Sequence, residues 1–129
     1  DIAQKLLARQ PVDVTMGQAN IIWQGEANDW ALRSLAHCSG PTSALNISGP
    51  RISTRSVALA LGERLGIQPE FTGQEAPTAW LVDCSEAFRL FGAPQVGLDT
   101  LLDWTADWAQ RGLGSLGKPT HFETRDGQY

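Results

Sequence analysis

Residues 43–66 read SALNISGPRISTRSVALALGERLG, and this stretch decides the fold class. Its beginning, residues 43–50, predicts a strand that ends in a Gly-Pro turn. Ser53 is expected to cap the helix that follows, because a serine oxygen can accept a hydrogen bond from a free N–H group of the first turn. From Val57 onward apolar residues recur at i, i+4 and i+8, and Gly66 is expected to end the helix. The stretch therefore predicts a unit of strand, loop and helix.

The segments before this unit also alternate between helices and strands. The sequence predicts a helix over 1–9, strands over 12–15 (VDVT) and 20–24 (NIIWQ), and a helix over 26–38. In the last of these helices, the residues expected to be buried are Ala27, Trp30, Ala31, Leu35, and Ala36 or Cys38.

The segments after the unit continue the alternation. The sequence predicts an apolar strand over 78–82 (TAWLV) and a short helix over 84–91 that begins with a capping box of Asp83 and Glu86. A long helix is expected over 98–111. This order of elements predicts an α/β (mixed α+β) fold with some parallel strand pairing.

Composition and charge limit the classes of function. A chain of 129 residues, of which 42% are hydrophobic and 19% charged, is expected to form a single domain over 1–129 with its own core. The net charge of −4 argues against nucleic acid and against an anionic membrane as partners. No apolar run is long enough to span a membrane, and the start DIAQKLLARQ lacks a signal-peptide pattern, so a cytoplasmic location is expected.

The cysteines and histidines do not suggest a metal site. Cys38 and Cys84 lie far apart and form no C-x-x-C pair, and His37 and His121 are the only histidines. A metal centre therefore has no sensible ligand set, and both thiols are expected to be free and buried.

The stretch 112–118, GLGSLGK, matches two phosphate-binding patterns, G-x-G-x-x-G and G-x-x-x-x-G-K. Both patterns require a strand before the glycines and a helix after them, because the helix N-terminus faces the phosphate. Here a helix is predicted before the glycines, and Pro119 follows them. We therefore expect a helix end and a turn, and no dinucleotide bound by this chain.

The run TAWLVDCSEAFRLFGAPQVGLDTLLDWTADW, residues 78–108, resembles the C-terminal end of the extended short-chain dehydrogenase/reductase family, the NAD-dependent epimerases and dehydratases. The resemblance includes Asp83, Ser85 and Ala87, then a Phe-Gly, a proline and a closing helix with a tryptophan. Residues 44–66 are similar to a late sheet strand of the family with its turn and capped helix. The ending KPTHFETRDGQY resembles the tail of a bacterial branch of these enzymes.

The resemblance implies the C-terminal substrate-binding lobe of such an enzyme, without most of the Rossmann domain. The family's glycine-rich turn and Tyr-x-x-x-Lys pair are missing, since Tyr129 is the only tyrosine. It follows that this chain has no catalytic residues and cannot act alone, while a longer parent would use NAD or NADP. The alternative is a stand-alone, non-catalytic binding or interaction module derived from the family. The choice of cofactor and the reaction type stay open.

The resemblance also directs the search for substrate-binding residues. Members that take nucleotide-diphosphate sugars commonly place an arginine before the strands matching NIIW and TAWLV, where this chain has Gln18 and Gln74. This departure favours a plainer sugar, a lactone or a small carbonyl compound. The candidate substrate-binding residues are Trp23, Gln24, Arg51 and Arg55, because ligands of open α/β sheets lie past the carboxyl ends of strands. The structural alternatives are a core tryptophan, a turn glutamine and solvated arginines.

Three further groups favour structural roles. Asp99, Asp103 and Asp107 are expected on a solvated helix face. Trp104 and Trp108 are expected to anchor the core, in preference to forming a platform for sugars. The tail 113–129, with His121 beside Glu123 and Arg125, is expected to be flexible or packed on a partner.

Self-association is expected through the face that a missing domain would cover, with the predicted strands SALNI and TAWLV contributing unpaired edges.

Overall fold

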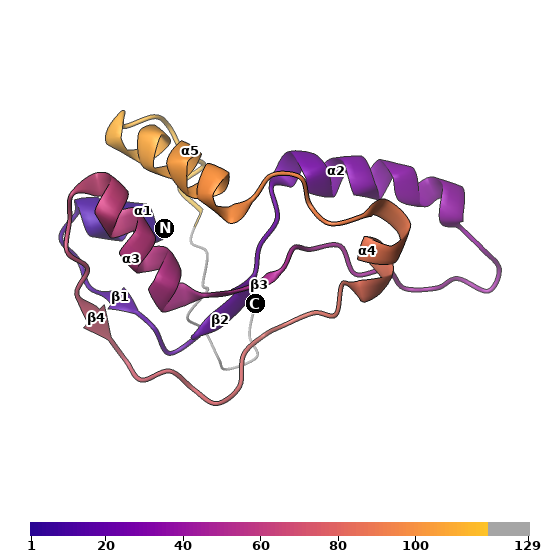
Figure 1. Cartoon of the computed structure of the whole chain (residues 1–129), viewed down its shortest axis with the longest axis horizontal. Helices are drawn as coiled ribbons and strands as arrows, with labels where there is room; N and C mark the ends of the chain where they lie inside the picture. The colour runs from indigo at the N-terminus through magenta and orange to yellow at the C-terminus, as the bar shows by residue number, and fades with distance from the viewer. Residues whose placement is uncertain (119–129) are drawn as a thin grey trace.

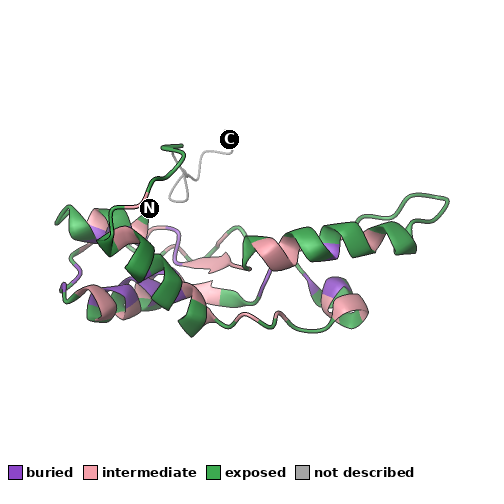
Figure 2. Ribbon diagram, turned by 90° about the horizontal axis from the view of Figure 1, so that it is seen from above, coloured by how far each residue is buried: buried purple, intermediate pink, exposed green. Residues whose placement is uncertain are grey.

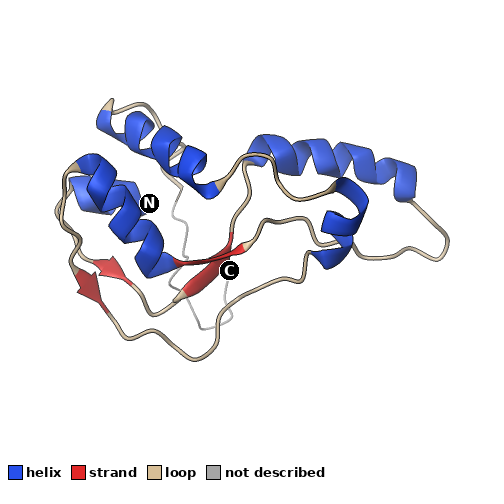
Figure 3. Cartoon of the chain, in the orientation of Figure 1, coloured by secondary structure: helices blue, strands red, loops and turns tan. Residues whose placement is uncertain are grey.

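Two groups of helices, one at each end of the molecule, are joined by a short strand ladder in a computed structural model that describes residues 1–118 (Figure 1). One end holds α1, α3 and α5, the other holds α2 and α4, and Figure 3 shows how little of the chain is strand. The elements in chain order are α1 (Ile2–Leu7), β1 (Val12–Asp13), β2 (Gln18–Asn20), α2 (Gln24–Arg33), the 3-10 helix η1 (Ser34–His37), β3 (Arg51–Ser53), α3 (Thr54–Leu65), β4 (Phe71–Thr72), α4 (Ser85–Phe91) and α5 (Leu98–Gln110).

The strands form two separate ladders. β1 pairs in parallel with β4, with Val12 opposite Phe71. β2 pairs antiparallel with β3, with Gln18 opposite Ser53 and Asn20 opposite Arg51. The prediction of a mixed helix and strand fold with some parallel pairing is therefore confirmed.

The core lies where α1, α3 and α5 meet, at one end of the molecule (Figure 2). Its buried residues are Ala3, Leu6, Val12, Val57, Ala58, Leu61, Ile67, Leu102 and Ala106. One of these three helices, α3, comes from the unit predicted over 43–66. The Ser53 side chain accepts a hydrogen bond from the N–H of Ser56 at 3.3 Å, and Gly66 ends α3 with a φ of 67°. Both predicted ends of this helix are confirmed.

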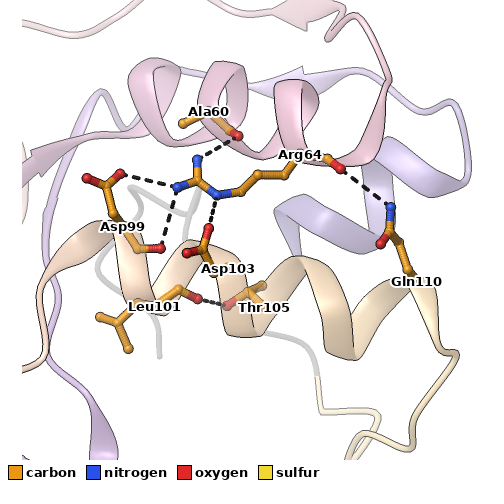
Figure 4. Close-up of polar contacts among 7 residues, drawn as sticks. All are labelled: Ala60, Arg64, Asp99, Leu101, Asp103, Thr105 and Gln110. Atoms are coloured by element: carbon orange, nitrogen blue, oxygen red, sulfur yellow. Dashed lines mark hydrogen bonds and ion pairs between the residues drawn. The ribbon is translucent and has the colours of Figure 1, made fainter.

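Arg64 fastens α3 to α5 at the surface of this core (Figure 4). Its guanidinium lies 2.6 Å from Asp103 and 3.2 Å from Asp99. The hydrogen bond to Asp103, with the charges of both carboxylates, raises the pKa of Arg64. Asp107 pairs with Arg111 at 3.2 Å. The expected acidic surface is confirmed, and its carboxylates are matched by arginines.

Three predicted strands are misplaced. Among the described residues, 43–50 and 78–82 contain no strand, and in place of 20–24 the strand β2 covers 18–20. Side-chain amides bind these segments where a ladder was expected. Asn20 donates to the carbonyl of Gly49 at 2.9 Å and accepts from the N–H of Val82 at 3.0 Å. Asn46 donates to the carbonyl of Asp83 at 3.1 Å.

The helix observed in the region 26–38 also differs from the predicted one in its extent and in which of its residues are buried. It divides into α2 and η1, and of the residues expected to be buried only Trp30 is, at 3% exposure. Leu35 is 69% exposed, and Ala31, Ala36 and Cys38 are exposed as well. Trp30 packs against Phe88 and Phe91 of α4, whereas Ala31, Leu35 and Ala36 lie on a face that no other element within 1–118 covers. Of the two thiols, Cys84 alone is buried.

Two predictions near the C-terminal helices are wrong. The capping box is absent, because Asp83 accepts from the N–H of Ser85 while Glu86 binds Arg89. Trp104 and Trp108 do not anchor the core, since they are 49% and 54% exposed. The buried positions of α5 are Leu102 and Ala106, and a residue two positions away points about 200° around a helix. The tryptophans therefore lie on the opposite face.

The loop after α5 agrees with the interpretation of GLGSLGK as a helix end. Gly112 follows the helix with a φ of 61°, and no helix occurs over 113–118. Pro119 and His121 lie outside the described residues. Within 1–118, no helix combines the length and the apolar character that crossing a bilayer requires.

Candidate functional site

Two of the four candidate residues, Arg51 and Arg55, lie where β3 leads into α3. The Nε of Arg51 donates to the side-chain oxygen of Gln18 at 2.5 Å, across the β2–β3 ladder. The Nε of Arg55 donates to Glu75 at 2.7 Å, and its guanidinium lies 4.4 Å from the centre of the Phe71 ring. Both arginines therefore have partners that hold them at the protein surface.

These contacts converge on one turn of the chain. Glu75 lies against Gly17, with its Cγ 3.3 Å from the place a Cβ would take there, and Gly17 directly precedes Gln18. We call the group Gln18, Arg51, Arg55 and Glu75 the arginine corner. Arg51 contacts a neutral amide, and no carboxylate of 1–118 forms an ion pair with it. The corner therefore holds one positive charge that a carboxylate or phosphate oxygen can pair with.

The other two candidates, Trp23 and Gln24, lie at the start of α2. Trp23 is 42% exposed, which rules out the core role, and its ring packs edge-to-face with the Trp104 ring, with 5.7 Å between the ring centres. Gln24 is the exposed first residue of the helix. In the described part of the chain, no hydrogen bond, ion pair or ring contact joins either residue to the arginine corner. The structure thus brings the candidates together in two pairs. Gln74, the second family departure, is exposed next to Glu75.

One carboxylate that the sequence did not single out lies close to Trp23 and Gln24 in α2. Both oxygens of Glu26, in α2, accept backbone N–H groups, from Gln95 at 2.5 Å and Val96 at 3.2 Å. The loop before α5 is thereby held beside the start of α2. The sequence could not predict these two hydrogen bonds, because both donors are backbone N–H groups, which are present in every loop.

Sequence reasoning also missed an open cavity at the surface, of about 380 Å³, at the far end of α2. Its walls are η1, the segment 38–45 and α4. The polar side chains that line it include His37, Cys38, Thr42, Ser43, Glu86 and Arg89. We call it the hydroxyl cavity. The only signal in the sequence was the run Ser-Gly-Pro-Thr-Ser over 39–43, which by itself indicates a loop.

An ion pair dominates the electrostatics of the hydroxyl cavity. Arg89 binds both oxygens of Glu86, through Nε at 2.8 Å and Nη2 at 2.6 Å. The hydrogen bonds from Arg89, together with its charge, hold the pKa of Glu86 below its usual range. The same pair raises the pKa of Arg89. Within 1–118, no cluster of histidine, cysteine and carboxylate side chains is suited to hold a metal ion.

Comparison with known proteins gives a match at the level of structure alone. No family model and no curated protein matches the sequence. A variant of UDP-glucuronic acid 4-epimerase from Bacillus cereus, in complex with UDP-4-deoxy-4-fluoro-glucuronic acid and NAD, is similar with a TM-score of 0.61 and 14% identity over 85% of this chain. A UDP-galactose 4-epimerase is similar with a TM-score of 0.60 and 16% identity over 88% of this chain.

The match covers a limited part of those enzymes. The chain spans 38% of the length of the first epimerase and 41% of the second. At these identities the likeness establishes the fold, which is that of part of an epimerase chain. What those enzymes bind or do does not pass to this chain by the likeness alone.

Proposed function

We propose that the chain is the C-terminal substrate-binding part of an NAD-dependent epimerase or dehydratase of the extended short-chain dehydrogenase/reductase family. The observation that carries the proposal is the likeness of 85% and 88% of the chain to part of two UDP-sugar epimerases. The order of motifs over 78–108 supports it independently. The substrate is a sugar or a small carbonyl compound, and the parent uses NAD or NADP in a part of the protein that this chain does not include.

The arginine corner supplies the recognition of substrate oxygens in this proposal. The guanidinium of Arg51 lies beside Gln18 and that of Arg55 beside Glu75, and planar donors of this kind suit carboxylate, hydroxyl or phosphate oxygens. Trp23 and Gln24 form a second contact region, with an exposed ring for an apolar face of the substrate. Because the family's catalytic tyrosine and lysine have no counterpart here, the chain positions substrate and does no chemistry itself.

The alternative is a stand-alone binding or interaction module without catalysis. The length of the encoded reading frame and the intact mass of the protein distinguish the two proposals. A reading frame that runs through a glycine-rich fingerprint and a Tyr-x-x-x-Lys pair before Asp1 supports the enzyme part. A protein whose intact mass matches translation from Asp1, or from one residue before it, supports the module.

Substrate binding is tested on the full encoded protein with Arg51→Gln and Arg55→Gln. Loss of a hydrogen bond to a charged group is expected to weaken binding of a sugar, lactone or UDP-sugar probe by about tenfold. Arg111→Gln is the matched control, because Arg111 is also a surface arginine, paired with Asp107 at 3.2 Å. Unchanged binding by both arginine-corner variants would exclude the corner from the substrate site.

A further inference from the structure

The hydroxyl cavity lies away from both pairs of candidate residues. Trp23 and Gln24 are at the start of α2, and the cavity is beyond its end, at η1. A helix of ten residues at about 1.5 Å per residue places the two ends about 15 Å apart. In Figure 1 the β2–β3 ladder is likewise on the side of α2 away from η1. A ligand in this cavity therefore does not compete for the arginine corner.

Aromatic packing around Phe91 of α4 fixes the walls of the cavity. The Phe91 ring lies 5.6 Å from Trp30 and 5.7 Å from His37, measured between ring centres, and the guanidinium of Arg33 lies over it at 4.9 Å. These contacts attach both α2 and η1 to α4. The cavity is thus formed between elements that are packed together, and its volume of about 380 Å³ falls within the range of small-molecule sites.

The charges in the cavity favour a neutral ligand. Glu86 and Arg89 form a doubly hydrogen-bonded pair that sums to zero. An ion of either sign would lose hydration in the cavity without meeting a net opposite charge, whereas a neutral molecule avoids that desolvation cost. The pair nevertheless leaves hydrogen-bonding capacity, because Nη1 of Arg89 makes no hydrogen bond within 1–118, and each oxygen of Glu86 has a second lone pair.

The remaining lining favours a ligand rich in hydroxyl groups. The hydroxyls of Ser34 and Ser39 donate to backbone carbonyls nearby, at 2.7 and 3.2 Å. Those of Thr42 and Ser43 make no hydrogen bond with another residue of 1–118, so they can donate or accept. Apolar lining comes from Ala44, Leu45 and Leu90, which suits the C–H face of a sugar-like ring.

From this arrangement we propose that the hydroxyl cavity binds a neutral, polyhydroxylated molecule of about monosaccharide size. Glu86 accepts from ligand hydroxyls, Arg89 and the Thr42 and Ser43 hydroxyls donate to ligand oxygens, and Leu45 and Leu90 contact the carbon ring. The site is additional to the proposed function and does not depend on it, since it shares no residue with the arginine corner.

Cys38 reports on occupancy of the cavity. It lines the cavity and is exposed, whereas Cys84 is buried, so a thiol reagent is expected to alkylate Cys38 first. The probes are D-glucose and myo-inositol, with gluconate and glucosamine as charged analogues of similar size. The neutral probes are expected to slow alkylation of the purified chain saturably, and both charged analogues to do so more weakly. The rate with free glutathione in the same solutions corrects for effects on the reagent.

Variants assign the protection to the cavity. Thr42→Val and Arg89→Leu are each expected to weaken protection by D-glucose by about tenfold. Their matched controls are Thr100→Val, an exposed threonine of α5, and Arg111→Leu, whose arginine is paired with a carboxylate of its own helix at 3.2 Å. The controls are expected to keep the wild-type protection, and circular dichroism verifies that each variant is folded.

Two results would overturn the proposal. The first is an alkylation rate of Cys38 that neither neutral probe changes, together with no saturation-transfer signal from them by NMR. The second is stronger protection by gluconate or glucosamine, which would contradict the charge argument. Arg51→Gln and Arg55→Gln are expected to leave Cys38 protection unchanged, so failure at this cavity and failure of the arginine corner are separate outcomes.

Discussion

Gly49 sits where two backbone segments touch. Its carbonyl accepts from the side chain of Asn20 at 2.9 Å, and the N–H of Ile21 donates to the carbonyl of Pro50 at 3.4 Å. A Cβ on Gly49 would overlap the carbonyl group of Ile21, which is backbone and cannot rotate away. Glycine is needed here for close approach, since the contact leaves no space for a side chain.

We expect Gly49→Ala to lower the free energy of unfolding by about 1–3 kcal/mol, because the two segments must separate to admit a methyl group. Urea titration followed by tryptophan fluorescence measures it. Gly114→Ala is the control, since a Cβ at Gly114 meets nothing within 4 Å. Equal unfolding midpoints for the two variants would show that the contact relaxes without cost.

What could be predicted for single residues depended on how far away their contacts are. The cap at Ser53 involves Ser56, three residues later, and the φ of Gly66 belongs to its own backbone, so local rules found both. Arg51 and Gln18 are 33 positions apart. Their pairing exists only because β2 and β3 align, and no local pattern encodes that alignment.

At the scale of elements, helices were easier to place than strands for a related reason. A helix satisfies its backbone within a few residues, so the periodicity around Leu102 or Val57 was enough to predict α5 and α3. A strand needs a neighbour. Residues 78–82 have the composition of a strand, but Asn20 and Asn46 provide the hydrogen bonds around them and no ladder forms. Composition predicts an extended chain and cannot predict which groups bind it.

Arg64 links two elements through ion pairs that the sequence did not reveal. We expect Arg64→Gln to lower the urea midpoint of unfolding, because α3 loses its bonds to Asp99 and Asp103 of α5. The difference from wild type should shrink as salt is raised, since both carboxylates are at the surface and are screened. Arg111→Gln, which breaks a pair within α5 alone, should change the midpoint less. A salt-independent difference would point to lost packing of the arginine stem as the cause.

At the scale of the whole molecule, the distribution of apolar side chains is uneven. The core is concentrated between α1, α3 and α5, while several large apolar residues outside this core are more than two fifths exposed. They include Trp23, Leu32, Leu35, Trp80, Val82, Trp104 and Trp108. The sequence could not predict this, because the spacing of Trp104 and Trp108 fits a helix face whether that face is covered or not. Only the position of α3 against Leu102 and Ala106 decides which face is inside.

The exposed tryptophans give a different basis for self-association from the one the sequence suggested. Strand edges at 43–47 and 78–82 cannot supply it, since neither segment is a strand. Trp104 and Trp108 are one helical turn apart on the outer face of α5, and the Trp23 ring adjoins Trp104, so the three indoles present one apolar area. Such areas on soluble proteins commonly contact another surface, and tryptophan is prominent among the residues that do so.

We therefore predict that the chain self-associates through this face. Sedimentation velocity over a series of concentrations should show a weight-average mass that rises with concentration, and Trp108→Lys should reduce the rise because a charge would be buried at the contact. Leu35→Lys is the control, since Leu35 is 69% exposed and lies in η1, beyond the end of α2 opposite to Trp23. A strictly monomeric wild type up to high micromolar concentration, with no binding of an apolar dye, would contradict the prediction and mean that the indoles are tolerated in water.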